Sequence, residues 1–92
     1  MSYISSMIDD YVGRKAVRFH MPGHKGKLGY ERDLTEVDDL DDLACPNGAI
    51  LNANKRIAKI YGMDYASMAT CGSTGCIHAM LLSSKGKVLI GR

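Results

Sequence analysis

The feature that most constrains this chain is a run of small residues, Gly72-Ser73-Thr74-Gly75, that leads directly into an apolar helical pattern. Glycine lets a backbone turn tightly and approach a ligand closely, and hydroxyl groups are common at helix starts. The first N–H groups of a helix have no partner inside it, and the peptide dipoles add partial positive charge at the same end. Gly72, Ser73, Thr74 and Gly75 are therefore predicted to cradle a phosphate; the alternative is that Ser73 only caps its own helix.

The segments around this cradle predict an alternation of strands and helices. Residues 65–70 are expected to form a short strand before it, and residues 87–90 to open a second strand after it. Between them a helix is expected from near Ser73, with Ile77, Met80 and Leu81 facing inward. This alternation favours an α/β fold.

Two amphipathic helices are predicted upstream of the cradle. The first is expected from near Ser2 to Gly13, and the second follows Pro46-Asn47-Gly48 and ends at Gly62. In the acidic run between them, leucine and valine recur every third residue, which favours one or two helical turns within residues 31–42. The apolar positions are Ile4, Met7, Ile8, Tyr11 and Val12 in the first helix and Leu34, Val37, Leu40 and Leu43 in the acidic run.

Charge and cysteine content exclude several classes of protein. A formal net charge of +2 in 92 residues is too small for a dedicated nucleic-acid binder. No stretch approaches the roughly 18 consecutive apolar residues that span a membrane. The odd number of cysteines cannot all be bridged with one another, and the lack of a C-x-x-C pair argues against a redox motif. We therefore expect a soluble protein of the reducing cytoplasm, without nucleic-acid or membrane partners.

A basic stretch from Arg14 to Lys27 precedes the acidic run, and both contain candidate functional side chains. The opposite charges are either solvated separately or paired with each other or with another subunit. His20 and His24 stand four residues apart, but Pro22-Gly23 between them breaks the helix that would align two metal ligands. No metal site is therefore predicted.

Several blocks of the sequence resemble one enzyme family. They are Phe19-His20-Met21-Pro22-Gly23-His24-Lys25-Gly26, then Asp33-Leu34-Thr35-Glu36, Leu40-Asp41-Asp42-Leu43 with Pro46-Asn47-Gly48, and Gly72-Ser73-Thr74-Gly75. In order and spacing they resemble the pyridoxal-phosphate-dependent ornithine/lysine/arginine decarboxylases, over about residues 15–92. The chain departs from that pattern at Cys71, where asparagine is expected, and at Lys27.

The resemblance implies an aspartate-aminotransferase-like (fold type I) domain with a mostly parallel sheet, of which this chain is the incomplete N-terminal portion. Residues 1–14 would be a leading helix and residues 15–92 the truncated start of the major domain. Pyridoxal 5′-phosphate (PLP) would bind at Gly72, Ser73, Thr74 and Gly75, and the substrate would be lysine, ornithine or arginine. The lysine that holds the cofactor covalently would lie beyond Arg92, so this piece would contain no catalytic residue and would be inactive alone.

The resemblance also implies partners. The chain would associate with the remainder of a decarboxylase or with a second subunit, as part of a homo-oligomer. His20, His24 and Lys25 would lie at the active-site entrance or the dimer seam; the alternative is a loop stiffened by Pro22 with imidazoles bonded to backbone. Two other functions stay open: a noncatalytic assembly or binding module derived from this fold, and a fragment of a fold type I aminotransferase.

Overall fold

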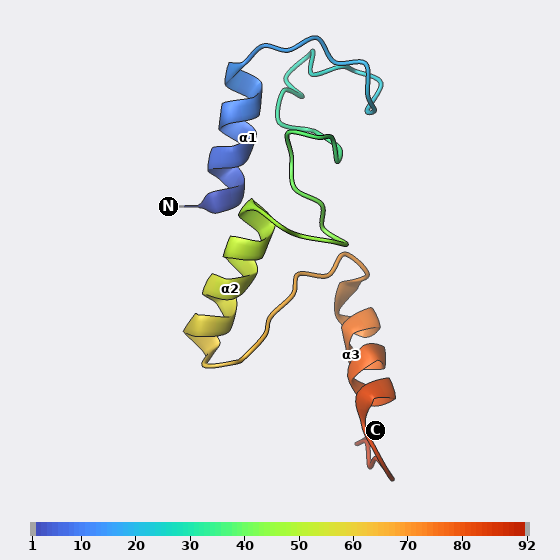
Figure 1. The fold of residues 1–92 in the computed structure, drawn as a ribbon. Helices are drawn as coiled ribbons and strands as arrows, with labels where there is room; N and C mark the ends of the chain where they lie inside the picture. Colours follow the sequence, from blue (N-terminus) through green and yellow to red (C-terminus); the bar gives the residue numbers. More distant parts are fainter. Residues whose placement is uncertain (1, 92) are drawn as a thin grey trace.

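The structure, a computed structural model, describes residues 2–91 and contains three helices joined by long open segments (Figure 1). They are α1 (Tyr3–Gly13), α2 (Ala49–Tyr61) and α3 (Gly72–Ser83). The predicted segments 1–14 and 15–92 begin at Met1 and end at Arg92, and these two residues lie outside the described part of the chain. The three predicted helices are thus confirmed.

Local signals explain the limits of the first two helices. The Ser2 hydroxyl oxygen accepts a hydrogen bond from the Ser5 N–H at the start of α1. Gly62 ends α2 in the left-handed conformation, with φ 64° and its N–H bonded to the Lys59 carbonyl. Asn52, Lys55, Arg56 and Lys59 are exposed, as the amphipathic pattern of α2 predicts.

The core is small, and α1 and α2 are the two helices that pack on each other. Tyr11 and Ala58 are the hydrophobic residues buried in the described chain, and Asp41 and Asn54 are buried with them. The radius of gyration is 17.3 Å, whereas a compact domain of this length has about 12 Å. The molecule is therefore extended, with principal dimensions of 54 × 27 × 21 Å.

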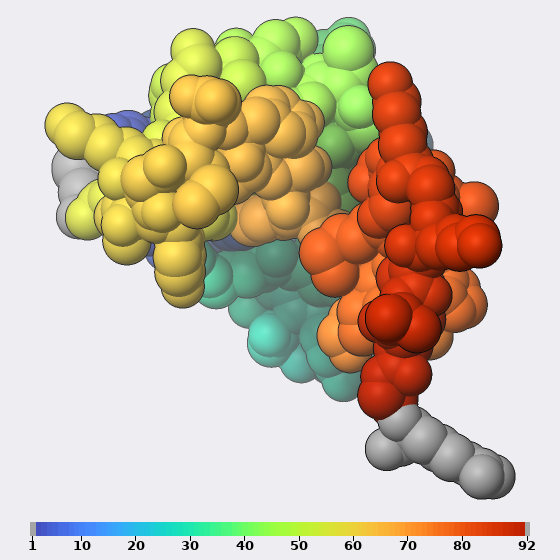
Figure 2. Space-filling model, turned by 90° about the horizontal axis from the view of Figure 1, so that it is seen from below, coloured from blue at the N-terminus to red at the C-terminus, as the bar shows by residue number. Residues whose placement is uncertain are grey.

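The α3 helix packs on neither α1 nor α2. In the space-filling view, α3 and the segment after it form a separate ridge beside the rest of the molecule (Figure 2). Ile77 and Met80 are exposed and Leu81 is half-buried, so the expectation that these three side chains face inward is wrong. Neither of the other two helices covers the apolar side chains of this helix.

The predicted α/β fold is also wrong, because residues 2–91 contain no strand and no sheet. A strand is defined by hydrogen bonds to a neighbouring strand. Residues 65–70 and 87–90 have no backbone hydrogen bonds to any other described segment and run as open chain. The aspartate-aminotransferase-like sheet is therefore not present in the described chain.

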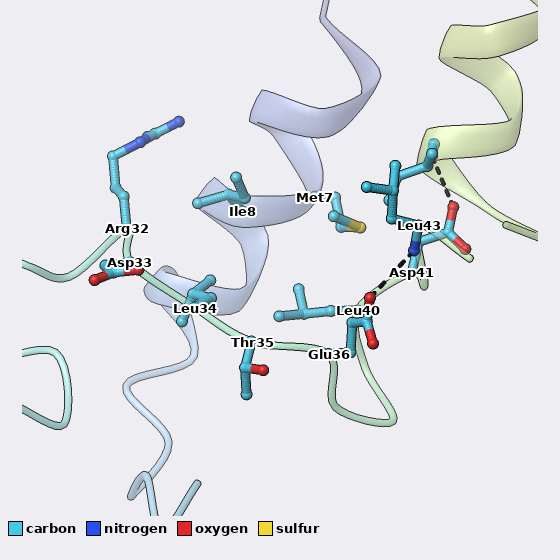
Figure 3. Close-up of a pocket in the computed structure, with 11 residues that line it drawn as sticks. Met7, Ile8, Arg32, Asp33, Leu34, Thr35, Glu36, Leu40, Asp41 and Leu43 are labelled. Atoms are coloured by element: carbon cyan, nitrogen blue, oxygen red, sulfur yellow. Dashed lines mark hydrogen bonds between the residues drawn. The ribbon is translucent and has the colours of Figure 1, made fainter. Parts of the chain in front are cut away.

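The expected helical turns in the acidic run are wrong as well. Residues 31–42 form tight turns and open chain, with a hydrogen bond from the Leu40 N–H to the Val37 carbonyl. Instead of forming one face of a helix, Leu34, Leu40 and Leu43 line a groove against α1 (Figure 3).

Candidate functional site

The predicted cradle lies at the start of α3. Gly72 is its first residue, with φ 74°, a left-handed conformation that favours glycine. The residue before it, Cys71, makes no side-chain capping bond, and no capping bond from Ser73 is present either. The alternative reading, in which Ser73 caps its own helix, is therefore not what the structure shows.

The Cys71 side chain leaves no room for a side chain at position 75. A Cβ atom at this position would lie 2.5 Å from Cys71 Sγ and 2.9 Å from Cys71 Cβ, which is closer than real atoms approach. Gly72 and Gly75 thus set the backbone of the first turn, while Ser73 and Thr74 are exposed on it. The free N–H groups and two hydroxyls form a set of hydrogen-bond donors, which suits a phosphate.

The second predicted region, the loop of residues 17–30, lies away from the cradle. Figure 1 places this loop beyond the far end of α1 from α2, and the start of α3 well below it. His20, His24 and Lys25 are together in this loop, but the structure does not bring them to Gly72–Gly75.

His20 is fixed by contacts at both ring nitrogens. Its Nε2 lies 2.8 Å from the hydroxyl of Tyr11 on α1, and its Nδ1 lies 2.5 Å from the Met21 carbonyl oxygen. Tyr11 is buried, so this bond joins the loop to the small core.

His24 is fixed in the same way by different partners. The Gly26 N–H donates to its Nδ1 at 2.9 Å, and its Nε2 lies 3.1 Å from Asp33 Oδ2. The imidazole also stacks on Tyr30, with ring centres 5.0 Å apart.

Lys25 and Arg18 hold the loop backbone. Lys25 Nζ donates to the carbonyls of Phe19 and His20 at 3.2 and 2.7 Å. The Arg18 guanidinium lies over the Tyr11 ring, 5.4 Å from its centre, and donates to the Glu31 carbonyl at 2.8 Å. A loop fixed by imidazole contacts to the backbone is thus confirmed, while a position at an entrance or dimer seam stays a prediction.

The loop of residues 17–30 exposes its large apolar side chains to solvent. Arg18, Lys25 and the two imidazoles bond to the chain itself, whereas the large apolar side chains are exposed, with Phe19 90% accessible. The other exposed apolar residues of the loop are Val17, Met21, Leu28 and Tyr30.

Asp41, from the Leu40-Asp41-Asp42-Leu43 block, caps α2 from outside the helix. The residue before α2, Gly48, has no side chain to cap with. Asp41 instead accepts hydrogen bonds from the N–H groups of Gly48 at 3.0 Å and Ile50 at 2.7 Å. Its other oxygen accepts from the N–H groups of Asp42 at 3.0 Å and Asn47 at 2.9 Å.

These bonds change the acidity of Asp41. Burial raises the pKa of its carboxyl, but the backbone N–H groups that bond to it outweigh burial and hold the pKa below its ordinary value of 3.8. The ionised form is therefore favoured, and it also suits the positive end of the α2 dipole.

A groove lies beside this cap (Figure 3). Met7 and Ile8 of α1 form one wall, and Leu40 and Leu43 lie opposite. The Leu43 N–H donates to Glu36 Oε1 at 3.3 Å across the opening. The groove thus lies between α1, the acidic run and the start of α2, and it is open instead of forming a closed ligand pocket.

Opposite charges of the two stretches are paired in part. Arg14 of the basic stretch contacts Asp39 of the acidic run at 3.0 Å. A second ion pair joins Arg32, within the acidic run, to Asp9 on α1, and Arg32 also donates to the Ser5 hydroxyl at 2.9 Å. Both ion pairs are largely exposed, so each stabilises the fold by at most about 1 kcal/mol.

Residues 2–91 show neither a metal-ligand cluster nor a membrane-spanning helix. No group of three or more histidine, cysteine, aspartate or glutamate side chains is placed to hold a metal ion there. None of the helices in this described range combines the length and apolar character needed to cross a bilayer.

Comparison with known families decides the relationship. Residues 3–92 match the family model for the Orn/Lys/Arg decarboxylase major domain. The chain belongs to the Orn/Lys/Arg decarboxylase family. The family is generally PLP-dependent, and the donors at the start of α3 fit the phosphate of that cofactor.

The curated relatives of this decarboxylase-family chain agree. It is 31% identical over 98 residues to the arginine decarboxylase of Bacillus subtilis, covering 89% of this chain and 20% of that protein. It is 32% identical to the arginine decarboxylases of Halalkalibacterium halodurans, covering 83% of this chain and 19% of that protein, and of Bacillus cereus, covering 86% and 21%. The chain thus spans about a fifth of their length. No solved structure matches it.

Sequence reasoning missed three positioning groups in this family member: Asp41, Arg18 and Tyr11. A signal existed only for Asp41, because an aspartate shortly before a helix whose capping position is glycine is a candidate cap. Arg18 and Tyr11 act on residues distant in sequence, and no local pattern identifies them.

Proposed function

We propose that this chain is part of a PLP-dependent decarboxylase of a basic amino acid and that Gly72, Ser73, Thr74 and Gly75 hold the cofactor phosphate. The observation that supports this assignment is the start of α3, where no side chain caps the helix and two hydroxyls are exposed beside its N–H groups. Family membership supplies the chemical context.

We propose arginine as the substrate. The curated relatives carry the name arginine decarboxylase. Lysine and ornithine are the alternatives within the family, and they differ from arginine in the charged group at the end of the side chain.

In the proposed mechanism, the residues of this chain bind and orient. Bound PLP supplies a ring that accepts the electrons left when carbon dioxide departs. The N–H groups of the first α3 turn and the hydroxyls of Ser73 and Thr74 hold the phosphate and thereby fix the orientation of the ring.

We assign no catalytic residue to this chain. The covalent cofactor lysine is proposed to come from the remainder of a decarboxylase chain or a second subunit. Lys25 does not suit this role, because its ammonium group already donates to two backbone carbonyls.

The same proposal includes assembly and location. We propose that a homo-oligomer or the rest of a decarboxylase chain covers α3, whose apolar side chains are exposed. The three cysteines are free in the structure, which suits a reducing cytoplasm.

The test is a binding titration with pyridoxine 5′-phosphate, which has no aldehyde and so cannot react with surface lysines. We expect it to bind more tightly than pyridoxine and to shift the amide resonances of residues 72–75. Replacing Ser73 and Thr74 together with alanine should raise the dissociation constant at least about tenfold, since one charge-assisted bond is worth about 1.5–3 kcal/mol.

The matched control is the double change Ser83→Ala and Ser84→Ala at the other end of α3. These hydroxyls donate to the Met80 carbonyl and lie away from the predicted cradle. Equal binding of pyridoxine and its phosphate, or equal losses in the two double variants, would contradict the assignment.

A further inference from the structure

The two loop histidines have partners that define where each ring proton lies. A neutral imidazole carries one N–H donor and one acceptor nitrogen. A carbonyl oxygen only accepts, so the contact with the Met21 carbonyl requires a proton on Nδ1 of His20. Its Nε2 is then the acceptor, and the Tyr11 hydroxyl donates to it.

His24 has the opposite arrangement. The Gly26 N–H can only donate, so Nδ1 of His24 must be the acceptor. The proton therefore lies on Nε2, which donates to the Asp33 carboxylate. The two imidazoles of one short loop are thus opposite tautomers.

We propose that Tyr11 is a positioning residue for this loop: its hydroxyl, together with the Met21 carbonyl, holds His20 as the Nδ1–H tautomer, while the Gly26 N–H holds His24 as the Nε2–H tautomer. Tyr11 is suited to this role because it is 7% exposed and sits on α1, the helix that packs on α2. Arg18 lies over its ring from the loop side and fixes it further.

The arrangement defines what the loop offers to its surroundings. Each imidazole has both nitrogens engaged, and Lys25 is bound to two carbonyls. Neither histidine is therefore a free proton acceptor, and the exposed contact groups are Phe19, Met21 and Leu28. This step rests on the proposed function, since it assigns the loop of a decarboxylase a shaping role and not an acid–base role.

The test reads the tautomers directly. Long-range nitrogen–proton NMR correlations of the 92-residue chain, recorded at about pH 9 where free imidazole is neutral, distinguish Nδ1–H from Nε2–H rings. We expect the Nδ1–H pattern for His20 and the Nε2–H pattern for His24. His78, which is exposed on α3 and has no hydrogen bond among the described residues, serves as the unconstrained reference.

The decisive variant is Tyr11→Phe, which keeps the ring under Arg18 and removes the hydroxyl. We expect it to raise the Nε2–H fraction of His20, because only the Met21 carbonyl then favours the Nδ1–H tautomer, while the His24 pattern is unchanged. The control is Tyr3→Phe, because Tyr3 lies on the same helix, is 45% exposed and makes no hydrogen bond through its hydroxyl in the described structure.

Two results would overturn the inference: an Nε2–H pattern for His20 in the unaltered chain, or an unchanged His20 pattern in a Tyr11→Phe variant that keeps its helical circular dichroism. The measurement on the unaltered chain decides the matter even if Tyr11→Phe does not fold. No cofactor is present in it, so failure of the phosphate titration and failure of this inference are separate results.

Discussion

Removing the carboxylate of Asp41 should destabilise α2, beginning at its first turn. Asp41 is 9% exposed and bonds to four backbone N–H groups, two of which, at Gly48 and Ile50, belong to the start of the helix. Loss of a helix cap costs about 0.5–2 kcal/mol, and the two bonds to the preceding turn add to it. We expect Asp41→Ala to cost about 2–4 kcal/mol and Asp41→Asn about half as much, since the amide keeps one acceptor oxygen.

Amide hydrogen exchange of the α2 interior measures this cost without requiring a single global transition. A loss of 2 kcal/mol corresponds to about a 30-fold drop in protection. The matched control is Asp38→Asn, since Asp38 is exposed in the same acidic run and bonds to nothing in the described chain. Similar protection in Asp41→Ala and Asp38→Asn would refute the capping role.

The effect should also depend on pH in a defined direction. The pKa of Asp41 is lowered in the folded chain, so its contribution is fully present above the ordinary value of 3.8 and is lost as the pH falls through the lower folded value. The difference in protection between the unaltered chain and Asp41→Asn should therefore be constant near neutral pH and shrink only below about pH 4. A difference that shrinks already near pH 6 would point to another group.

Three further predictions follow from the loop, the cradle and the exposed helix. Gly26→Ala should lower protection of the loop amides more than Gly29→Ala, because both positions have positive φ (72° and 86°) but only at Gly26 would a Cβ lie 2.5 Å from Arg18 Cζ. Equal effects would show that backbone strain alone matters. The 92-residue chain with added PLP should release no carbon dioxide from arginine, lysine or ornithine; turnover above a cofactor-only control would contradict the absence of catalytic residues. Light scattering should show self-association, because apolar residues of α3 are exposed; a monomer across a wide concentration range would contradict it.

The helices could be predicted from sequence because their limits depend on neighbours. Ser2 bonds to an N–H three residues away, and Gly62 supplies a left-handed stop directly after α2. The cradle glycines could be singled out for the same reason, since Gly72 takes the positive φ expected of glycine at a tight turn.

The features that could not be predicted depend on contacts between segments, which the spacing of residues in the sequence does not reveal. Residues 65–70 have a strand-like composition, but strand formation needs a partner segment, and the described chain provides none. The leucines of the acidic run recur at helical spacing, yet Asp41 between them turns toward backbone N–H groups up to nine residues ahead. The side-chain partners of His20 and His24 are likewise distant: Tyr11 and Asp33 each lie nine residues from the histidine they contact.

The isolation of α3 affects how tightly its first turn can bind an anion. A helix of 12 residues that packs on no other helix is only marginally stable in water. Binding at its N-terminus then requires the helix to form, so the apparent dissociation constant equals the intrinsic one divided by the fraction of chains in which α3 is helical. Anything that covers α3 would raise phosphate affinity without touching the phosphate, and phosphate would in turn raise the helicity of α3.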